Sequence, residues 1–232
     1  MKEVLRQERK FLLTGTQRLR FESQLDALLH QDPHNGADGN YLVRSLYFDT
    51  PGNRDFQEKA DGVELRKKLR LRIYSTEAAT VLLEMKQKQG NNQFKRSLLM
   101  KREDAEQLAE GNFAPLLDYK EDFAAECYAL INRDLYLPGT IVEYQRKAYV
   151  LPENDIRITL DSQIRAAECC GSLFFERSPG LYPVMDPWKT ILEVKYNHFL
   201  LSYVRDIIRS CNQSELSLSK YCMARKLTLT LN

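Results

Sequence analysis

The stretch Glu64–Tyr74, with the sequence ELRKKLRLRIY, places a cation at every second position from Arg66 to Arg72. In a β-strand successive side chains point to opposite faces of the sheet. One face would therefore carry the four cations Arg66, Lys68, Arg70 and Arg72, and the other would be mostly aliphatic. Guanidinium groups pair bidentately with phosphate oxygens, and lysine adds a compact point charge. This spacing therefore suits the binding of a phosphate-rich anion.

Other expected strands repeat the pattern of one apolar face and one cationic face. The cations on these faces are Lys86, Lys95, Arg146, Arg157 and Lys195. On a single strand, such a charged face is more often the solvated side of an ordinary sheet. The excess of Arg and Lys on strand after strand favours instead a closed barrel with the polar face inside. Repulsion among cations in such a lumen would be costly unless an anion were bound there.

The basic residues are concentrated in one segment of a nearly neutral chain. The 232 residues carry a net charge of +2, which gives no reason to expect a nucleic-acid-binding protein. From Lys59 to Lys101, however, there are eleven Lys or Arg and four Asp or Glu, an excess of seven positive charges. This segment is therefore the expected place for an anionic partner.

Hydrophobic periodicity and turn residues predict about eight strands, mostly antiparallel, with helices between and after them, which is an α+β fold. The predicted strands are 4–13, 41–50, 62–74, 79–87, 92–99, 139–151, 155–166 and 190–197. The three from 62 to 99 read as a meander, and the strands at 139–151 and 155–166 as a hairpin. Helices are predicted at 16–31 with Thr16 as N-cap, and at 103–110, 122–134, 198–210 and 217–227.

The chain length fits a single domain over residues 1–232 with a sizeable core. No apolar run approaches the roughly 18 residues that a membrane-spanning helix needs. The N-terminal sequence MKEVLRQERKF is too charged for a secretory signal. The five cysteines form no C-x-x-C pair, so neither a disulfide framework nor a zinc site is indicated. A cytoplasmic protein is expected.

Eight motifs, taken in order, resemble one family: RQERKF, YFDT, RKKLRLRIY, LLEMKQK, VEYQRKAYV, IRITLDSQIRA, ILEVKYN and SLSKY. They are similar to the VTC domain, the polyphosphate-polymerase domain of vacuolar transporter chaperone complexes and their bacterial relatives. That domain belongs to the triphosphate tunnel metalloenzymes. The resemblance spans essentially the whole chain. It implies an eight-stranded antiparallel β-tunnel, a closed barrel with a basic lumen, flanked by α-helices.

The resemblance also implies the site, position by position. Residues that resemble catalytic positions are Lys10, Arg70, Arg72, Lys195 and Lys220. Residues that resemble phosphate-binding positions are Lys59, Lys86, Lys95, Arg146, Arg157 and Ser219. Glu193 resembles the metal-ligating glutamate. Two roles stay open for Glu8, Glu84 and Asp161: each could pair with a cation or assist in binding the metal.

One position departs from the pattern of the wider superfamily, which begins with E-x-E-x-K. Here these positions are Arg6, Glu8 and Lys10. The arginine weakens a reading as a cyclase or hydrolase of the CYTH type and favours the VTC branch. It also leaves Glu193 with less acidic help in holding a metal.

The activity implied is an ATP-dependent polyphosphate polymerase, which transfers the γ-phosphate of ATP to a growing chain. The implied cofactor is a divalent metal, Mn²⁺ rather than Mg²⁺. Phosphoryl transfer needs positioning and charge neutralisation more than a protein nucleophile. Two alternatives stay open, a tri- or polyphosphate or nucleoside-triphosphate hydrolase of the same fold and a non-catalytic polyphosphate-binding module. The expected partners are ATP and polyphosphate, with no nucleic acid. Any coupling to a membrane would require a membrane-protein partner.

Overall fold

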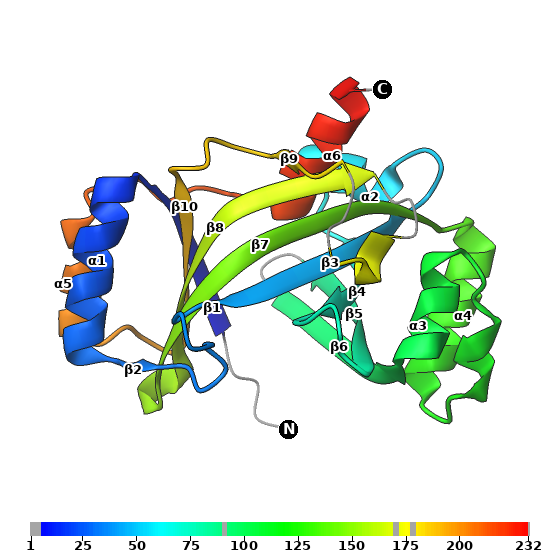
Figure 1. Ribbon diagram of the computed structural model, residues 1–232, viewed down its shortest axis with the longest axis horizontal. Helices are drawn as coiled ribbons and strands as arrows, with labels where there is room; N and C mark the ends of the chain where they lie inside the picture. The colour runs from blue at the N-terminus through cyan, green and yellow to red at the C-terminus, as the bar shows by residue number, and fades with distance from the viewer. Residues whose placement is uncertain (1–5, 90–91, 169–171, 177–179, 232) are drawn as a thin grey trace. The chain divides into compact units, whose positions relative to one another are not determined.

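The structure is a computed structural model, and it describes residues 6–89, 92–168, 172–176 and 180–231 (Figure 1). The strands are β1 (Arg6–Leu13), β2 (His30–Gln31), β3 (Tyr41–Asp49), β4 (Arg66–Ile73), β5 (Thr80–Gln89), β6 (Asn92–Lys101), β7 (Leu137–Leu151), β8 (Ile156–Glu168), β9 (Tyr182–Pro183) and β10 (Thr190–Asn197). The α-helices are α1 (Gly15–Leu28), α2 (Arg54–Ala60), α3 (Arg102–Ala109), α4 (Asp122–Asp134), α5 (Ser202–Ser210) and α6 (Lys220–Leu231). Short 3₁₀ helices lie at Ala114–Asp118, Glu153–Asp155 and Ser172–Phe174.

All ten strands belong to one hydrogen-bonded sheet, with the order β1-β10-β8-β7-β3-β4-β5-β6. The short strands β2 and β9 pair with β7 and β8. Each pairing whose register is described is antiparallel, which confirms the predicted α+β class and the β4-β5-β6 meander. Within the described residues, β1 and β6 are the ends of this path and do not pair with each other. The sheet is therefore not closed by hydrogen bonds, and the predicted closed barrel is not confirmed.

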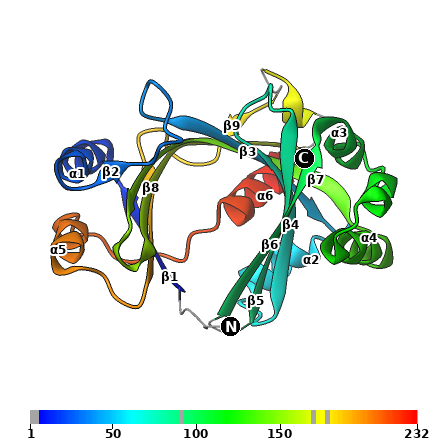
Figure 2. The same cartoon turned by 90° about the horizontal axis from the view of Figure 1, so that it is seen from below.

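The chain divides into two compact units, and β3, β7 and β8 each contribute residues to both. Unit 1 comprises residues 1–42, 144–164 and 185–218. Its core joins one face of the strands to two helices, for example Phe11 of β1, Leu25 of α1 and Ile207 of α5. Figure 1 and Figure 2 show α1 and α5 lying side by side. Burial of this apolar face leaves the polar side chains of the strands on the other face.

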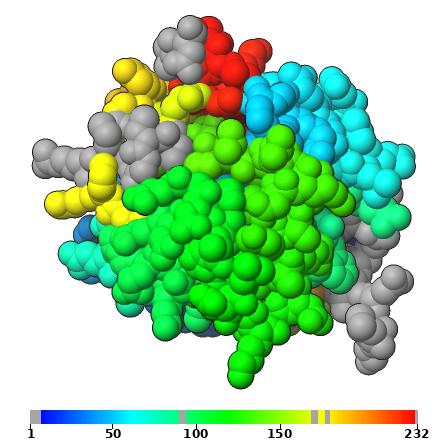
Figure 3. All heavy atoms as spheres, turned by 90° about the vertical axis from the view of Figure 1, so that its right-hand side faces the viewer, coloured from blue at the N-terminus to red at the C-terminus, as the bar shows by residue number. Residues whose placement is uncertain are grey.

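Unit 2 comprises residues 43–143, 165–184 and 219–232. Its core packs Leu69, Leu71 and Ile73 of β4 against helical residues such as Leu108 of α3 and Ile131 of α4. Figure 3 looks onto the helical side of this unit, where residues of α3 and α4 cover most of the surface in view. The aliphatic face of β4 thus faces helices, as predicted, and the cations occupy its other face.

Several helices differ from the sequence-based predictions in their boundaries, and one was not predicted. Helix α1 is capped by Thr14, not by Thr16: the Thr14 side chain accepts the N–H of Gln17, and the Gln17 side chain accepts the N–H of Thr14 at 2.9 Å. Helix α2 was not predicted, because only Asp55 of its seven residues is buried and it has no apolar stripe. Helices α5 and α6 begin later than predicted, at Ser202 and Lys220.

Three of the cysteines are described, and Cys127, Cys211 and Cys222 are free thiols. Cys169 and Cys170 lie outside the described residues. Among the helices that the structure describes, none combines the length and the apolarity needed to cross a membrane.

Candidate active site

The first polar cluster, in unit 2, is centred on Glu84 of β5. The carboxylate of Glu84 is 1% exposed. It pairs with Arg70 at 2.7 Å and Arg72 at 3.6 Å, and it also forms an ion pair with Lys95 of β6. Burial alone would raise the pKa of Glu84, but Arg70, Arg72 and Lys95 outweigh it and lower the pKa to about 2. The cluster therefore holds three cations around one permanent anion and keeps a net positive charge.

A row of lysines lies beside this cluster on the same face. The register of the sheet pairs Lys68 with Lys86 and Lys86 with Lys95, so three cations stand next to one another across β4, β5 and β6. Like charges directly opposite one another destabilise a sheet. A bound polyanion would relieve this repulsion. Lys68 also donates to the Ser219 hydroxyl at 2.8 Å, just before α6 begins.

The positive charge of the same cluster changes the pKa of Tyr47 on β3. Arg70 donates to the Tyr47 hydroxyl at 2.7 Å. Burial would raise the pKa of Tyr47, but Arg70, Arg72 and Lys68 overcome this effect and lower the pKa to about 8. Tyr47 thus reports the electrostatic potential at the place where phosphate is expected.

We expect Tyr47 to ionise near pH 8 in the anion-free protein and at higher pH when tripolyphosphate is bound. The added negative charge offsets the cations that favour the phenolate, so the pKa must rise. The measurement is the tyrosinate absorbance across a pH titration, taken as the difference between the wild type and Tyr47→Phe, which removes the signal of the other tyrosines. An unchanged difference titration in the presence of bound tripolyphosphate would contradict a phosphate site at this cluster.

The second polar cluster, in unit 1, lies on the neighbouring antiparallel strands β1 and β10. Lys10 pairs with Glu8 at 2.7 Å and with Glu193 at 3.5 Å, and Lys195 also pairs with Glu193. Lys10 donates to the carbonyl of Leu218 at 3.2 Å. Burial would lower the pKa of Lys10, but Glu193 and Glu8 outweigh it and raise the pKa above its ordinary value. Lys10 is therefore a permanent cation and unsuited to act as a general base.

Two arginines on the hairpin of unit 1 complete this cluster. Arg146 of β7 binds Asp161 of β8 bidentately, at 2.6 and 2.8 Å. Asp161 is 0% exposed. Arg157 pairs with Asp32 at 2.7 Å and donates to the Tyr41 hydroxyl at 3.1 Å. Burial would lower the pKa of Arg146, but Asp161 raises it well above the ordinary value, so this arginine stays charged.

The donor atoms of unit 1 fit a divalent metal that completes its coordination with phosphate oxygens and water. In the part of the chain that the structure describes, no group of three or more His, Cys, Asp or Glu side chains could hold a metal by itself. Glu193 nevertheless has a second carboxylate nearby, Glu8, since both pair with Lys10. Thr159 of β8 lies directly opposite Glu193 of β10 in the strand register. The buried hydroxyl of Thr159 has no hydrogen-bond partner among the described residues. Such hard oxygen donors match Mg²⁺ or Mn²⁺.

The family of the chain is decided by a comparison with protein-family models. The model of the VTC domain matches residues 5–229. The chain belongs to the VTC domain family. The predicted resemblance is thereby confirmed. A search of curated proteins found no match to this VTC domain.

Two solved structures resemble this VTC domain over nearly their full lengths. A putative adenylate cyclase from Bacillus halodurans has 13% sequence identity and a TM-score of 0.52, covering 93% of this chain and 95% of that one. A putative adenylyl cyclase from Hippeastrum, described as having a dominant triphosphatase activity, has 13% identity and a TM-score of 0.53, covering 96% and 97%. At such identities the likeness shows the fold alone.

The site residues predicted for the VTC domain fall into both units. Those in unit 1 are Lys10, Arg146, Arg157, Glu193 and Lys195, and those in unit 2 are Lys59, Arg70, Arg72, Lys86, Lys95, Ser219 and Lys220. Glu193 brings two of the predicted lysines together, and Glu84 brings Arg70, Arg72 and Lys95 together. Lys59 lies on α2 and Lys220 is the first residue of α6. The three acids that were left unranked, Glu8, Glu84 and Asp161, each pair with a cation.

Sequence reasoning assigned no role to Tyr47, to Thr159, or to Tyr221, whose ring stacks on that of Tyr47. The period-2 pattern already contained Tyr47, because Ser45, Tyr47 and Asp49 alternate along β3. Leu65, on the mostly aliphatic face of the predicted strand 62–74, is 65% exposed because it precedes β4. It lines a pocket of about 370 Å³ with basic residues that include Arg66, Lys67 and Lys88. The side chain of Arg6, which marked the departure from the superfamily pattern, lies outside the described side chains.

Proposed function

We propose that this VTC domain is an ATP-dependent polyphosphate polymerase. The observation that carries the proposal is the basic face of β4, β5 and β6, where Arg70, Arg72 and Lys95 surround one carboxylate beside a row of lysines in register. Positive charge at this density suits a substrate with about one negative charge per phosphate. Family membership supports the same substrate class.

We further propose that each of the two polar clusters binds phosphate oxygens and that residues 1–232 work as a single tunnel domain. Strands β7 and β8 run through both units, and both clusters combine Arg and Lys with a carboxylate. In this proposal the arginines clamp phosphate oxygens with their planar forks, and Lys10 and Lys195 neutralise charge near Glu193. The protein is proposed to be cytoplasmic, as the sequence suggested.

The proposed reaction needs no covalent protein intermediate. A terminal oxygen of the growing chain attacks the γ-phosphorus of ATP, the bond from that phosphorus to the β,γ-bridging oxygen breaks, and ADP leaves with the electron pair. Arg70 and Arg72 would stabilise the charge on the transferring phosphoryl oxygens. Lys10, held protonated by its two carboxylates, would orient the chain and not exchange protons.

Glu193, Glu8 and Thr159 are the residues proposed to hold the divalent metal. When bound, such an ion neutralises phosphate charge and polarises the transferring group. The carboxylates are occupied by lysines in the described structure. These lysines would turn to phosphate oxygens as the ion arrives with its substrate. Mn²⁺ is proposed over Mg²⁺ on the family resemblance.

The decisive experiment incubates the purified protein with ATP and Mn²⁺ and follows polyphosphate on a stained gel while ADP is measured in parallel. A ladder of long anionic polymer with a matching amount of ADP is expected. Free phosphate without polymer would assign the protein to the hydrolases of this fold. Binding without turnover would make it a binding module. Either result would overturn the proposed polymerase.

Replacing Glu193 with glutamine is expected to weaken Mn²⁺ binding about 10-fold or more in the presence of tripolyphosphate, because a neutral amide is a far poorer ligand for a hard cation. Electron paramagnetic resonance of free Mn²⁺ measures this without any turnover. Glu153→Gln, which changes an exposed carboxylate of the same unit, is the matched control. Equal Mn²⁺ affinity in the two variants would remove Glu193 from the metal site.

A further inference from the structure

Asp49, the last residue of β3 and part of the YFDT motif, has no role in the reaction described above. Its carboxylate is buried and accepts three backbone N–H groups: those of Thr50 at 2.7 Å, Asp55 at 2.9 Å and Phe56 at 3.0 Å. The last two belong to α2, whose N-cap residue Asn53 makes no side-chain capping bond. Asp49 therefore satisfies the otherwise unpaired amides at the start of α2.

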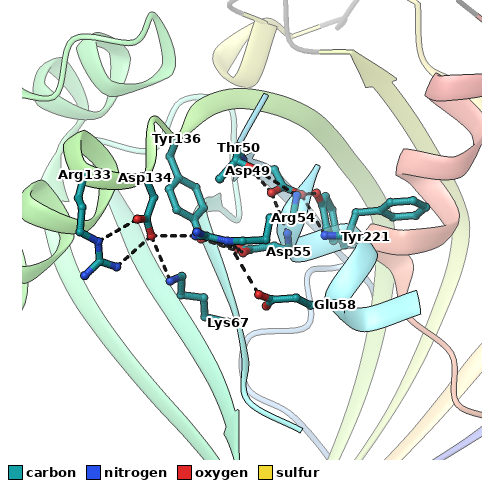
Figure 4. A network of polar contacts seen from close by, with 11 residues as sticks. Asp49, Thr50, Arg54, Asp55, Glu58, Lys67, Arg133, Asp134, Tyr136 and Tyr221 are labelled. Atoms are coloured by element: carbon teal, nitrogen blue, oxygen red, sulfur yellow. Dashed lines mark hydrogen bonds and ion pairs between the residues drawn. The ribbon is translucent and has the colours of Figure 1, made fainter. Parts of the chain in front are cut away.

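A fourth donor reaches Asp49 from the C-terminal helix. The hydroxyl of Tyr221, in the first turn of α6, donates to the Asp49 carboxylate, and the Tyr221 side chain is 2% exposed (Figure 4). Burial and the nearby Asp49 raise the pKa of Tyr221, so its proton stays in this bond. Asp55, in the first turn of α2, is held separately by the Tyr136 hydroxyl, which donates to its carboxylate at 2.8 Å, as Figure 4 shows.

Tyr221 also contacts the basic cluster of unit 2. Its ring stacks on Tyr47 with centroids 4.7 Å apart, and the ammonium of Lys68 lies 5.2 Å from its ring centroid. Lys68 in turn donates to the Ser219 hydroxyl, which also accepts the N–H of Cys222 at 3.3 Å. One tyrosine therefore joins a buried carboxylate to two residues of the candidate site, Tyr47 and Lys68.

A second hydrogen bond joins α6 to the start of α2, one turn further along α6. Arg225 donates to the Asn53 side chain at 2.7 Å, and it also pairs with Glu168 at the end of β8 at 2.5 Å. The end of β3 and the N-cap residue of α2 thus hold α6 at two successive turns. Figure 1 shows α2 and α6 next to each other.

We propose that Asp49 and Tyr221 form a latch that positions the first turn of α6, and with it Ser219 and Lys68, for binding phosphate. The assignment rests on the proposed function, because Ser219 and Lys68 matter only if a phosphate chain binds this face. Asp49 and Tyr221 touch neither substrate nor reacting atoms in this role; they are positioning residues. The role explains why β3, which otherwise serves the core and the basic face, ends with the aspartate of the YFDT motif.

The test compares Tyr221→Phe and Asp49→Asn with the wild type. Tyr221→Phe keeps the ring and its stacking and removes only the hydroxyl, while Asp49 keeps its three backbone donors, so the fold is expected to persist. We expect amide hydrogen exchange in the first turn of α6 to accelerate about tenfold or more, since its buried hydrogen bond to the Asp49 carboxylate is lost. Tripolyphosphate affinity, measured by calorimetry at fixed ionic strength, is expected to fall about 5- to 20-fold.

Tyr119→Phe is the matched control, because it also removes a tyrosine hydroxyl that donates to an aspartate, Asp104, at 2.6 Å, on α3 of the same unit. It should change neither the exchange of α6 nor the affinity. Unchanged exchange of α6 in both latch variants would overturn the latch, and faster exchange with unchanged affinity would overturn its positioning role. Absence of binding by the wild type would contradict the proposed function and, with it, the positioning role. The exchange rates, measured without ligand, would still decide whether the latch exists.

Discussion

Polyphosphate synthesis by Arg72→Ala is expected to fall about 100- to 1,000-fold in kcat/KM, the usual effect of removing one preorganised charge donor from a transition state. Arg72 is buried on the cationic face of β4, where it donates to Ser45 at 3.2 Å and lies near Glu84. The folded state should persist, because Arg70 and Lys95 still neutralise the Glu84 carboxylate. ADP release and polymer length, measured together, report the loss.

Two further variants make the Arg72 experiment specific. Arg72→Lys keeps the charge and loses the planar fork, so an intermediate activity is expected. Arg66→Ala removes a cation on the same face of the same strand, three alternate positions away, and controls for a general loss of positive charge. If Arg72→Ala and Arg66→Ala lose activity equally, the face acts only through its overall charge, and the specific role of Arg72 is wrong.

The largest effect on stability is expected from Arg146→Ala, which should lower the free energy of unfolding by about 3–5 kcal/mol. The variant leaves the Asp161 carboxylate, which is 0% exposed, without its bidentate partner. A loss of this size is a large part of the roughly 5–15 kcal/mol that stabilises a typical domain. Urea denaturation followed by circular dichroism measures it.

The double variant Arg146→Ala/Asp161→Ala separates the cost of an unpaired charge from the cost of lost packing. Because it removes both charges, it should be less destabilised than Arg146→Ala alone. Arg209→Ala, in an exposed pair with Asp206 at 3.9 Å, should change the free energy of unfolding by less than about 0.5 kcal/mol. A double variant less stable than Arg146→Ala would show that the buried pair stabilises the fold by more than mutual neutralisation.

Regular patterns made the strands and their faces predictable from the sequence. The alternation in Arg66–Ile73 placed the cations and aliphatic residues of β4 on the faces that they occupy, and α4 spans the predicted residues Asp122–Asp134. These elements repeat one residue type at one period, so local information was sufficient. Helix α2 has no such repeat, since it is held by the Asp49 carboxylate and not by an apolar stripe.

The composition of the candidate site was predictable only in part. Cations on strands could be assigned from the alternation and the family motifs, but their partners could not. Glu84 and Asp161 are adjacent to their arginines only through strand pairing, and Tyr221 reaches Asp49 across 172 positions of the chain. Such contacts depend on register and on how a helix returns to the sheet. A single sequence does not encode either in a local pattern.

The carboxylate of Glu84 bears on how a long polymer could move past the arginines. A basic face without any anion of its own would hold a polyphosphate chain so tightly that each advance by one unit would cost several broken ion pairs. Because Glu84 already pairs with Arg70, Arg72 and Lys95, an arriving phosphate would exchange one anionic partner for another, and a departing phosphate would leave these three cations paired with the carboxylate. The free energy of the bound polyphosphate chain would then vary less with its position along this face. In the proposed polymerase, Glu84 would lower the affinity of the basic face for the polyphosphate chain and so allow the chain to move along it.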